Sequence, residues 1–299
     1  MSETHSHVDI IVTGRSARVG TISVRRTLPT VRRRMVGPFT FLDHIGPVAA
    51  DEGRVDVPPH PHIGLATLTY IFEGQLLHRD SLGNAQAIRP REVNWMVAGR
   101  GISHSERGPA VSPRMHAVQA WVALPAEAEE VEPSFLHAGE SALPLLTDNG
   151  VAAQLLAGSA YGLESAVTSY SPMFYVGTRL DRGASLPLPR EYPERAAYVA
   201  RGAIEESGQA YGVGQLVVFK AGGEPVLTAT ADAELLLLGG EPVGPRYMWW
   251  NFVSSRRERI DQAKADWAAG RIPLPTGDAE EFVPLPHDSW PLPQPEPMS

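Results

Sequence analysis

The sequence predicts an all-β protein made of antiparallel sandwich or barrel domains, with one helix and an extended tail at its C-terminal end. Short stretches of alternating apolar and polar residues recur about every eight to twelve residues, separated by turn signals. The 299 residues include 28 glycines and 27 prolines, too many for a helical bundle. The pattern also repeats, since Tyr70 to Gly74 has an echo in Tyr198 to Gly202. This echo indicates an internal duplication, and therefore two similar domains.

The first half of the chain contains most of the predicted strands. Residues 8–24 alternate apolar and polar side chains and predict two short strands, with Gly14 and Gly20 between them. Residues 37–45 predict an apolar strand that ends in the turn at Gly46-Pro47. Further strands are expected, in chain order, over residues 65–72, 75–79, 93–97 and 116–122. Residues 81–84 have the composition of a hairpin turn between two of them.

The expected domain limits follow from composition. A loop rich in Glu and Pro, residues 127–133, separates the two sets of strands, so we expect domains over residues 1–130 and 131–250. Residues 251–299 form a third part. In it, Ser255-Arg256-Arg257-Glu258 has the form of a capping box, and Gly270 with Pro273 predicts the helix end. The proline-rich stretch from Leu274 to Ser299 should be extended and pack, with the helix, on the barrels.

Composition excludes several classes of function. The formal net charge is −8, so direct nucleic-acid binding is not expected, although Arg25 to Arg34 form a local basic cluster. There is no cysteine, which excludes disulfides, thiolate metal sites and cysteine nucleophiles. The sequence shows no signal peptide and no apolar run long enough to span a membrane. We therefore expect a cytoplasmic protein without membrane contact.

Two pairs of side chains predict a metal site. Residues two apart in a strand share a face, so His60 and His62 can point the same way, as can His104 and Glu106. On neighbouring strands, the two pairs would bring three neutral nitrogens and one carboxylate to one point. This is a ligand set for one divalent metal ion, and without cysteine it favours iron, manganese, nickel, copper or zinc. The alternative is a polar cluster that holds no metal.

The second copy of the repeat carries different residues at the corresponding places. Keeping the register of the echo, His60-Pro61-His62 falls on Leu188-Pro189-Arg190, and His104 and Glu106 fall near Leu227 and Ala229. The second domain is therefore expected to have no His-based metal site. His5 and His7 repeat the His-x-His spacing, but they stand in a polar segment without strand pattern, which we expect to be disordered.

Three motifs together resemble the pirin family: Pro58 to His62, Gly99 to Glu106, and Pro38-Phe39-Thr40-Phe41-Leu42-Asp43-His44. Residues 78–84, 119–125 and 248–254 are similar to further signatures of that family. The resemblance implies two cupin barrels facing each other, with one metal ion, usually iron as Fe(II), in the N-terminal barrel. His60, His62, His104 and Glu106 would be its ligands. Residues 64–67 lack the glutamate that pirins often carry there.

The resemblance also implies an activity, because some pirins are similar to quercetin 2,3-dioxygenase. A small aromatic substrate such as a flavonol would then be opened by O₂, with Glu106 taking the proton of the 3-hydroxyl group. We expect the flat substrate to stack on one of four side chains: Phe39, Phe41, Ile63 or Trp95. His116 is expected either to orient a metal ligand or to be a hydrogen-bonded barrel histidine.

Two alternatives remain from the sequence. The chain could be a non-enzymatic, iron-binding redox sensor that modulates a protein partner, such as a transcription factor or a metabolic enzyme, with Arg25 to Arg34 as its contact surface. It could instead hold a closed, tetrahedral structural zinc. A monomer is expected, because a chain with two similar barrels can serve as its own dimer.

Overall fold

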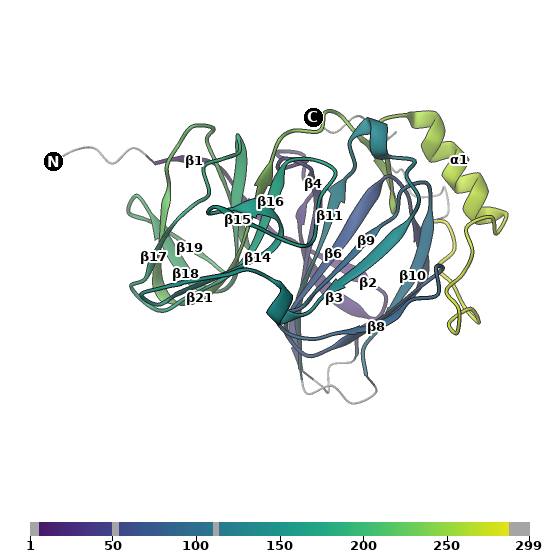
Figure 1. Cartoon of the computed structure of the whole chain (residues 1–299), viewed down its shortest axis with the longest axis horizontal. Helices are drawn as coiled ribbons and strands as arrows, with labels where there is room; N and C mark the ends of the chain where they lie inside the picture. Colours follow the sequence, from purple (N-terminus) through teal and green to yellow (C-terminus); the bar gives the residue numbers. More distant parts are fainter. Residues whose placement is uncertain (1–5, 50–53, 110–113, 287–299) are drawn as a thin grey trace. The chain divides into compact units, whose positions relative to one another are not determined.

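The computed structural model describes residues 6–49, 54–109 and 114–286. Its elements are antiparallel β-strands with one α-helix in the described part of the chain, which confirms the predicted all-β fold class (Figure 1). Contacts group the chain into two compact units that interleave in sequence. We call residues 16–24, 41–139 and 243–299 the N-terminal barrel, and residues 1–15, 25–40 and 140–242 the C-terminal barrel. The domain limits expected from the sequence stay a prediction.

The N-terminal barrel is built on two sheets. One has the strand order β12-β9-β6-β11-β4-β3-β2, and the other has the order β5-β10-β7-β8. The first comprises β2 (Arg15–Val19), β3 (Ile22–Leu28), β4 (Phe39–Ala49), β6 (Leu65–Glu73), β9 (Val93–Val97), β11 (Arg114–Ala123) and β12 (Ser134–Ala138). The second comprises β5 (Asp56–His62), β7 (Leu76–Asp80), β8 (Ala85–Ile88) and β10 (Ile102–Arg107).

Most predicted strands of this barrel are confirmed, but residues 8–24 hold Val8–Thr13, β2 and the start of β3 rather than two strands, and one predicted end is wrong. β4 runs through Gly46-Pro47 to Ala49 rather than stopping at the expected turn. Gly46 has φ +79°, and a Cβ there would lie 2.1 Å from the carbonyl oxygen of Met115. Its lack of a side chain allows β4 to approach β11 closely at that point, so the strand continues.

The C-terminal barrel is a ten-stranded sheet with the main order β1-β20-β18-β21-β16-β14-β13. Its main strands are β1 (Val8–Thr13), β13 (Leu145–Asp148), β14 (Val151–Ala160), β16 (Met173–Leu180), β18 (Glu194–Glu206), β20 (Gln215–Phe219) and β21 (Val226–Gly240). Three short strands pair beside them: β15 (Leu163–Glu164), β17 (Ser185–Pro187) and β19 (Gln209–Gly212). Short 3₁₀ turns occur at Ala126–Ala128 in the N-terminal barrel and Glu140–Ala142 in the C-terminal barrel.

The start of the chain belongs to the C-terminal barrel. β1 pairs with β20, and Figure 1 shows it in purple among green strands. Just before it, the Nδ1 atom of His7 lies 2.7 Å from Oε1 of the buried Glu206. The expectation that His7 is disordered is therefore wrong, because a buried carboxylate far along the sequence binds its ring. His5 lies outside the described residues.

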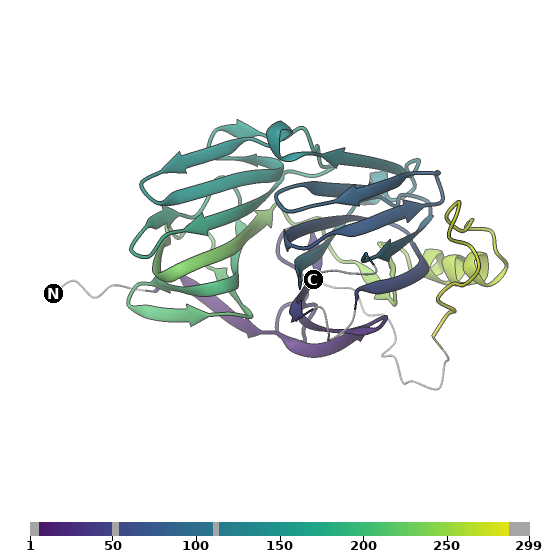
Figure 2. The same cartoon turned by 90° about the horizontal axis from the view of Figure 1, so that it is seen from below.

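The helix α1 (Arg257–Ala268) follows a hairpin of β22 (Tyr247–Trp249) and β23 (Phe252–Ser254) in the N-terminal barrel (Figure 2). Its side chains Ile260, Ala263 and Trp267 pack in a buried cluster with Ile63. The predicted capping box is wrong, because Arg256 is the N-cap and makes no side-chain cap bond. Ser255 instead donates its backbone N–H and its hydroxyl to the carboxylate of Glu129.

The segment after the helix packs against β5 and β10. Ser103 of β10 donates its hydroxyl to the carbonyl of Pro273, and Ser105 donates to Asp278 at 2.7 Å. The Val283 N–H donates to the carbonyl of Pro59 in β5. Ser103 and Ser105 alternate with His104 along the strand, so this segment supports the face opposite to that histidine. Residues 287–299 of the predicted tail lie outside the described residues.

No helix in the described part of the chain is long and apolar enough to cross a membrane.

Candidate metal centre

The two motif pairs lie on neighbouring strands, as their spacing predicts. β5 and β10 are paired antiparallel, with His104 directly opposite His60 and Ile102 opposite His62. The register then shifts, so that Glu106 lies opposite Val57. Pro58 and Pro59 occupy the extra length of β5 at this bulge, where prolines, which lack an N–H, are tolerated. The bulge lets β5 bend beside the ligand positions.

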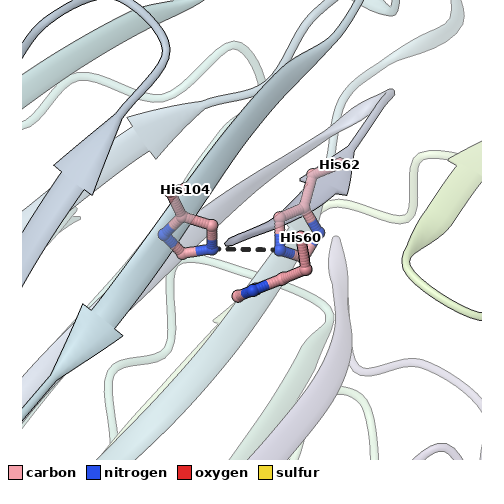
Figure 3. A group of neighbouring side chains, drawn as sticks. All are labelled: His60, His62 and His104. Carbon is pink, nitrogen blue, oxygen red and sulfur yellow. Dashed lines mark hydrogen bonds between the residues drawn. The ribbon is translucent and has the colours of Figure 1, made fainter. Parts of the chain in front are cut away.

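Three imidazoles converge between these strands. One ring nitrogen from each of His60, His62 and His104 lies within 4.8 Å of the others, and the three side chains are buried. Figure 3 shows the Nε2 atoms of His62 and His104 pointing at each other, 3.2 Å apart, with the ring of His60 beside them. Among the described residues this is the one group of three or more potential ligands gathered in this way. The structure thus joins three of the four predicted ligands.

Hydrogen bonds fix which nitrogens face the centre. His60 donates its Nδ1–H to the carbonyl of Pro58 at 2.9 Å, and His62 donates its Nδ1–H to the carbonyl of Asn251 at 3.2 Å. A neutral imidazole carries one proton, so both Nε2 atoms keep a lone pair. The sequence did not reveal Asn251 as a partner of His62.

Burial keeps these rings neutral. It lowers the pKa of His60 to about 4, although the hydrogen bond to Pro58 opposes this shift. Burial lowers the pKa of His62 and His104 well below the usual range, and the neighbouring imidazoles lower it further. A metal ion binds the unprotonated ring, so at neutral pH protons do not compete for these three nitrogens.

The donor set fits a metal ion. Two nitrogens that each lie about 2.1 Å from one ion, at right angles around it, are separated by about 3 Å. The Nε2 atoms of His62 and His104 have this separation, at 3.2 Å. Facing lone pairs in a buried site repel each other unless a proton or a cation lies between them. Three neutral imidazoles without a thiolate suit a first-row transition metal.

Glu106 lies on β10 two residues beyond His104, with its carboxylate outside the group of three nitrogens. Thr69 Oγ1 lies 3.3 Å from Glu106 Oε1 and 2.7 Å from Gln119 Oε1. Burial raises the pKa of the Glu106 carboxyl, while His78 and the hydrogen bond from Thr69 oppose this rise. The structure therefore presents a carboxylate next to the histidines, and its role as fourth ligand stays a prediction.

An aromatic side chain closes one side of the group. Trp121 of β11 meets the ring of His62 edge to face at a centroid distance of 5.0 Å. Phe41 of β4 stacks on Trp121, with centroids 3.9 Å apart and planes 12° apart. Trp121 was not among the four side chains predicted to stack with a substrate, although it stands in one of the quoted motifs.

Two of those four side chains lie in other surroundings. The first two residues of β4 are grouped with the C-terminal barrel, and there Phe39 packs against Tyr175, at 5.5 Å between centroids. Ile63 is buried in the cluster under α1. The alternation of a strand predicts which residues share a face, but it does not predict which neighbour covers that face. Trp95 is also buried, on β9.

His116 is a hydrogen-bonded barrel histidine, one of the two expectations for it. Its Nε2 lies 2.7 Å from Nε2 of His44, and its ring stacks on Phe72 at 4.5 Å. The histidine that contacts the three potential ligands, which we call the ligand group, is His78. Nδ1 of His78, on β7, lies 3.3 Å from Nδ1 of His104. The sequence carried a signal for it, because His78-Arg79-Asp80 has the same two-residue spacing as the ligand pairs.

Comparison with known proteins identifies the family. The Pirin family model matches residues 21–122, and the model of the pirin C-terminal cupin domain matches residues 175–273. A pirin-like protein of Caulobacter vibrioides is 52% identical over 286 residues, covering 93% of this chain and 99% of the relative. A protein of Pseudomonas aeruginosa, provisionally named a quercetin 2,3-dioxygenase, is 39% identical over 273 residues, covering 90% and 86%.

Solved structures agree with this result. The crystal structure of a quercetin 2,3-dioxygenase from Acinetobacter baumannii matches with a TM-score of 0.86 and 33% identity, over 93% of this chain and 95% of that one. A bacterial pirin from Escherichia coli, solved with nickel(II), has the same fold, with a TM-score of 0.63 over 78% and 99% of the two chains at 20% identity. The chain belongs to the pirin family.

Proposed function

We propose that the chain is a metal-dependent dioxygenase that opens the central ring of a flavonol of the quercetin type with O₂. The observation that carries the proposal is the buried group of three imidazoles next to a carboxylate. Relatives named as quercetin 2,3-dioxygenases, 39% and 33% identical to this chain, support the choice of substrate class. The overall reaction adds both atoms of O₂ to the flavonol and releases carbon monoxide.

The residues that would hold the metal ion are His60, His62, His104 and Glu106, and we propose Fe(II) as that ion. When bound, it would supply Lewis acidity toward the flavonol oxygens and one-electron chemistry toward O₂. Fe(II) is typical of sites that combine histidines with one carboxylate and keep open coordination positions. Zinc, manganese, nickel and copper are the competing ions.

Glu106 would take the proton from the 3-hydroxyl group of the flavonol. Its carboxylate lies beside Thr69, whose single hydroxyl proton is shared between Glu106 Oε1 and the nearer Gln119 Oε1. The raised pKa of Glu106 makes it a stronger base than an exposed glutamate. Removing the proton leaves an electron-rich flavonolate, which O₂ attacks more readily than the neutral flavonol.

Trp121 and Phe41 would bind the flat rings of the substrate. They form a stacked pair, and Trp121 contacts His62. A flat aromatic ligand stacks well on such a pair. When both faces of the ligand are buried, water is excluded from its reacting carbon atoms. Of these two, Phe41 was among the four side chains expected from the sequence to stack on the substrate, and Trp121 was not.

The test is anaerobic reconstitution of the metal-free protein with Fe(II), followed by quercetin and air. We expect loss of the flavonol absorbance band together with release of carbon monoxide. His60→Ala should abolish both signals and the bound iron. His137→Ala is the matched control, because that histidine contacts Asn94 and is not part of the ligand group.

Other outcomes separate the alternatives. Full iron loading without loss of quercetin would contradict the proposed reaction. Partner binding that follows the iron oxidation state would then favour the non-enzymatic sensor. Parallel reconstitution with Mn(II), Ni(II), Cu(II) and Zn(II) tests the choice of metal, and turnover that is higher with another ion would contradict Fe(II).

A further inference from the structure

Behind His104, a chain of hydrogen bonds leads to a buried carboxylate. β7 pairs with β10 so that Asp80 lies opposite His104 and His78 lies opposite Glu106. Nδ1 of His104 lies 3.3 Å from Nδ1 of His78, and Nε2 of His78 lies 3.1 Å from Oδ2 of Asp80. All three side chains are buried, and Asp80 is 0% exposed.

With both imidazoles neutral, the acceptor at the end of this chain sets the position of each proton in it. An ionised carboxylate can only accept, so His78 donates its Nε2–H to Asp80. The Nδ1 atom of neutral His78 is then bare and can only accept. His104 must therefore donate its own Nδ1–H to His78, which leaves the lone pair of its Nε2 aimed at Nε2 of His62.

Asp80 is held in its ionised form by the turn that follows β7. The backbone N–H groups of Leu82 and Asn84 donate to its Oδ1 at 3.0 and 3.1 Å, and the Asn84 amide donates to both oxygens. Burial alone would raise the pKa of Asp80, but the hydrogen bonds from His78 and Asn84 outweigh it and lower the pKa. The turn after β7 therefore keeps the carboxylate ionised and fixed in place.

The ring of His78 is fixed as well. It stacks on Phe135, with centroids 4.4 Å apart and planes 16° apart. A half-turn flip of this ring would keep the stacking but put carbon atoms where the two nitrogens now meet Asp80 and His104, so both hydrogen bonds would be lost. The orientation of His78 is therefore set by the barrel before any metal ion binds.

We infer that His78 and Asp80 are positioning residues that hold His104 in the tautomer able to bind a metal ion through Nε2. His60 and His62 obtain the same tautomer from backbone carbonyls, whereas His104 obtains it from a second side chain and a buried charge. The inference rests on the proposed metal site, and it adds two residues to the set on which metal binding depends.

Asp80→Asn inverts the chain with a side chain of the same shape, and the Asn84 amide keeps only its bond to the remaining oxygen. The amide oxygen must take the place of Oδ1, because two backbone N–H groups donate there. The amide nitrogen then faces His78 and donates to its Nε2, so His78 must donate from Nδ1. His104 is left to accept at Nδ1 and to carry its proton on Nε2, where the metal ion would bind.

The experiment has two measurements on the full-length protein. Metal affinity is measured with Ni(II), an air-stable probe, by competition with a chelator. We expect Asp80→Asn and His78→Phe to weaken binding about 10- to 100-fold, the range for loss of an outer partner of a ligand. Nitrogen-15 NMR of metal-free, histidine-labelled protein reads the tautomers directly. We expect a protonated Nδ1 on His104 in the wild type and a protonated Nε2 in Asp80→Asn.

His116→Phe is the matched control. His116 is also buried, stacks on a phenylalanine and contacts a second histidine, but that histidine, His44, is not part of the ligand group. We expect Ni(II) affinity within about twofold of the wild type, since no ligand loses a partner. A similar loss of affinity in this variant would show general loosening of the barrel and overturn the inference.

The remaining outcomes are also decisive. A folded Asp80→Asn protein with unchanged Ni(II) affinity would overturn the inference, as would weaker binding without a change of tautomer. If the wild type binds no metal, the proposed function fails, yet the tautomer of His104 still tests the chain of hydrogen bonds. If Asp80→Asn does not fold, the wild-type spectrum and His78→Phe decide, and a protonated Nε2 on wild-type His104 contradicts the inference.

Discussion

The two barrels differ clearly at the positions that the predicted internal repeat aligns. In the N-terminal barrel, His60, His62 and His104 are buried and gather around one point. The C-terminal barrel has Leu188 and Leu227 at two of the matching positions, and both belong to its large apolar cluster. Ala229, which aligns near Glu106, is part of the same cluster.

The comparison shows that the same strand pattern can carry either an apolar core, which stabilises the barrel, or a buried polar group suited to metal binding. Buried leucine side chains contribute about 1.5 to 3 kcal/mol each to stability, whereas buried polar rings contribute only when each is hydrogen-bonded. The N-terminal barrel meets this requirement with the carbonyls of Pro58 and Asn251 and with the chain from His78 to Asp80. We therefore expect substitutions in the N-terminal group to change metal binding, and those in the C-terminal cluster to change stability.

The largest expected effect comes from making the N-terminal barrel resemble its counterpart. His104→Leu should lower metal affinity by more than about 100-fold, beyond the loss caused by an outer partner. The free energy of unfolding of the metal-free protein should fall by no more than about 3 kcal/mol, because leucine fills a similar volume but leaves Nδ1 of His78 without its donor. Metal analysis and urea unfolding measure the two quantities. Retention of one tightly bound ion per chain would contradict the proposed site.

The converse substitution is Leu227→Ala in the C-terminal barrel. It should lower the free energy of unfolding by about 2 to 5 kcal/mol, because the side chain is fully buried and leaves a cavity. Metal content of the folded protein should not change. A loss of metal at temperatures where the protein stays folded would show that the two barrels are coupled. It would contradict the assignment of metal binding to the N-terminal group alone.

A smaller effect is expected from Thr69→Val, which removes the hydroxyl beside Glu106. Turnover of quercetin should fall about tenfold, which corresponds to the loss of one buried hydrogen bond, while bound iron stays the same. Thr178→Val is the control in the C-terminal barrel, where the hydroxyl is buried without a hydrogen-bond partner. Equal losses in the two variants would argue against a role for Thr69 at Glu106.

The smallest expected effect concerns acid stability of the C-terminal barrel. Burial of Glu206 raises its pKa, but hydrogen bonds from Ser207 and His7 outweigh this and lower the pKa below the ordinary value of 4.5. The unfolded chain therefore binds more protons in this range. The stabilisation is present above the unfolded pKa and is lost as pH falls through the folded pKa.

Glu206→Gln should therefore flatten the decline of the unfolding free energy between about pH 5 and pH 3. Urea unfolding at several pH values measures this slope. An unchanged slope in the variant would mean that Glu206 keeps an ordinary pKa in the folded protein.

The sequence by itself determined the fold class and predicted the three histidines that the structure gathers. Strand alternation predicts that His60 and His62 share a face, and absence of cysteine limits the site to nitrogen and oxygen ligands. Both inferences need only neighbouring residues or composition, so no tertiary information was required. The same holds for Leu188 and Leu227 in the second repeat, where a hydrocarbon side chain cannot bind a metal ion whatever its surroundings.

The tertiary structure decided which strands meet. It brought β7 beside β10, so that His78 and Asp80 stand behind His104, and it placed Trp121 rather than Ile63 beside His62. It also paired β1 with β20 and bound His7 to Glu206, about 200 residues away along the chain. Local pattern cannot predict such contacts. Strand pairing and the choice of covering side chain depend on packing among residues far apart in sequence, which only the folded chain brings together.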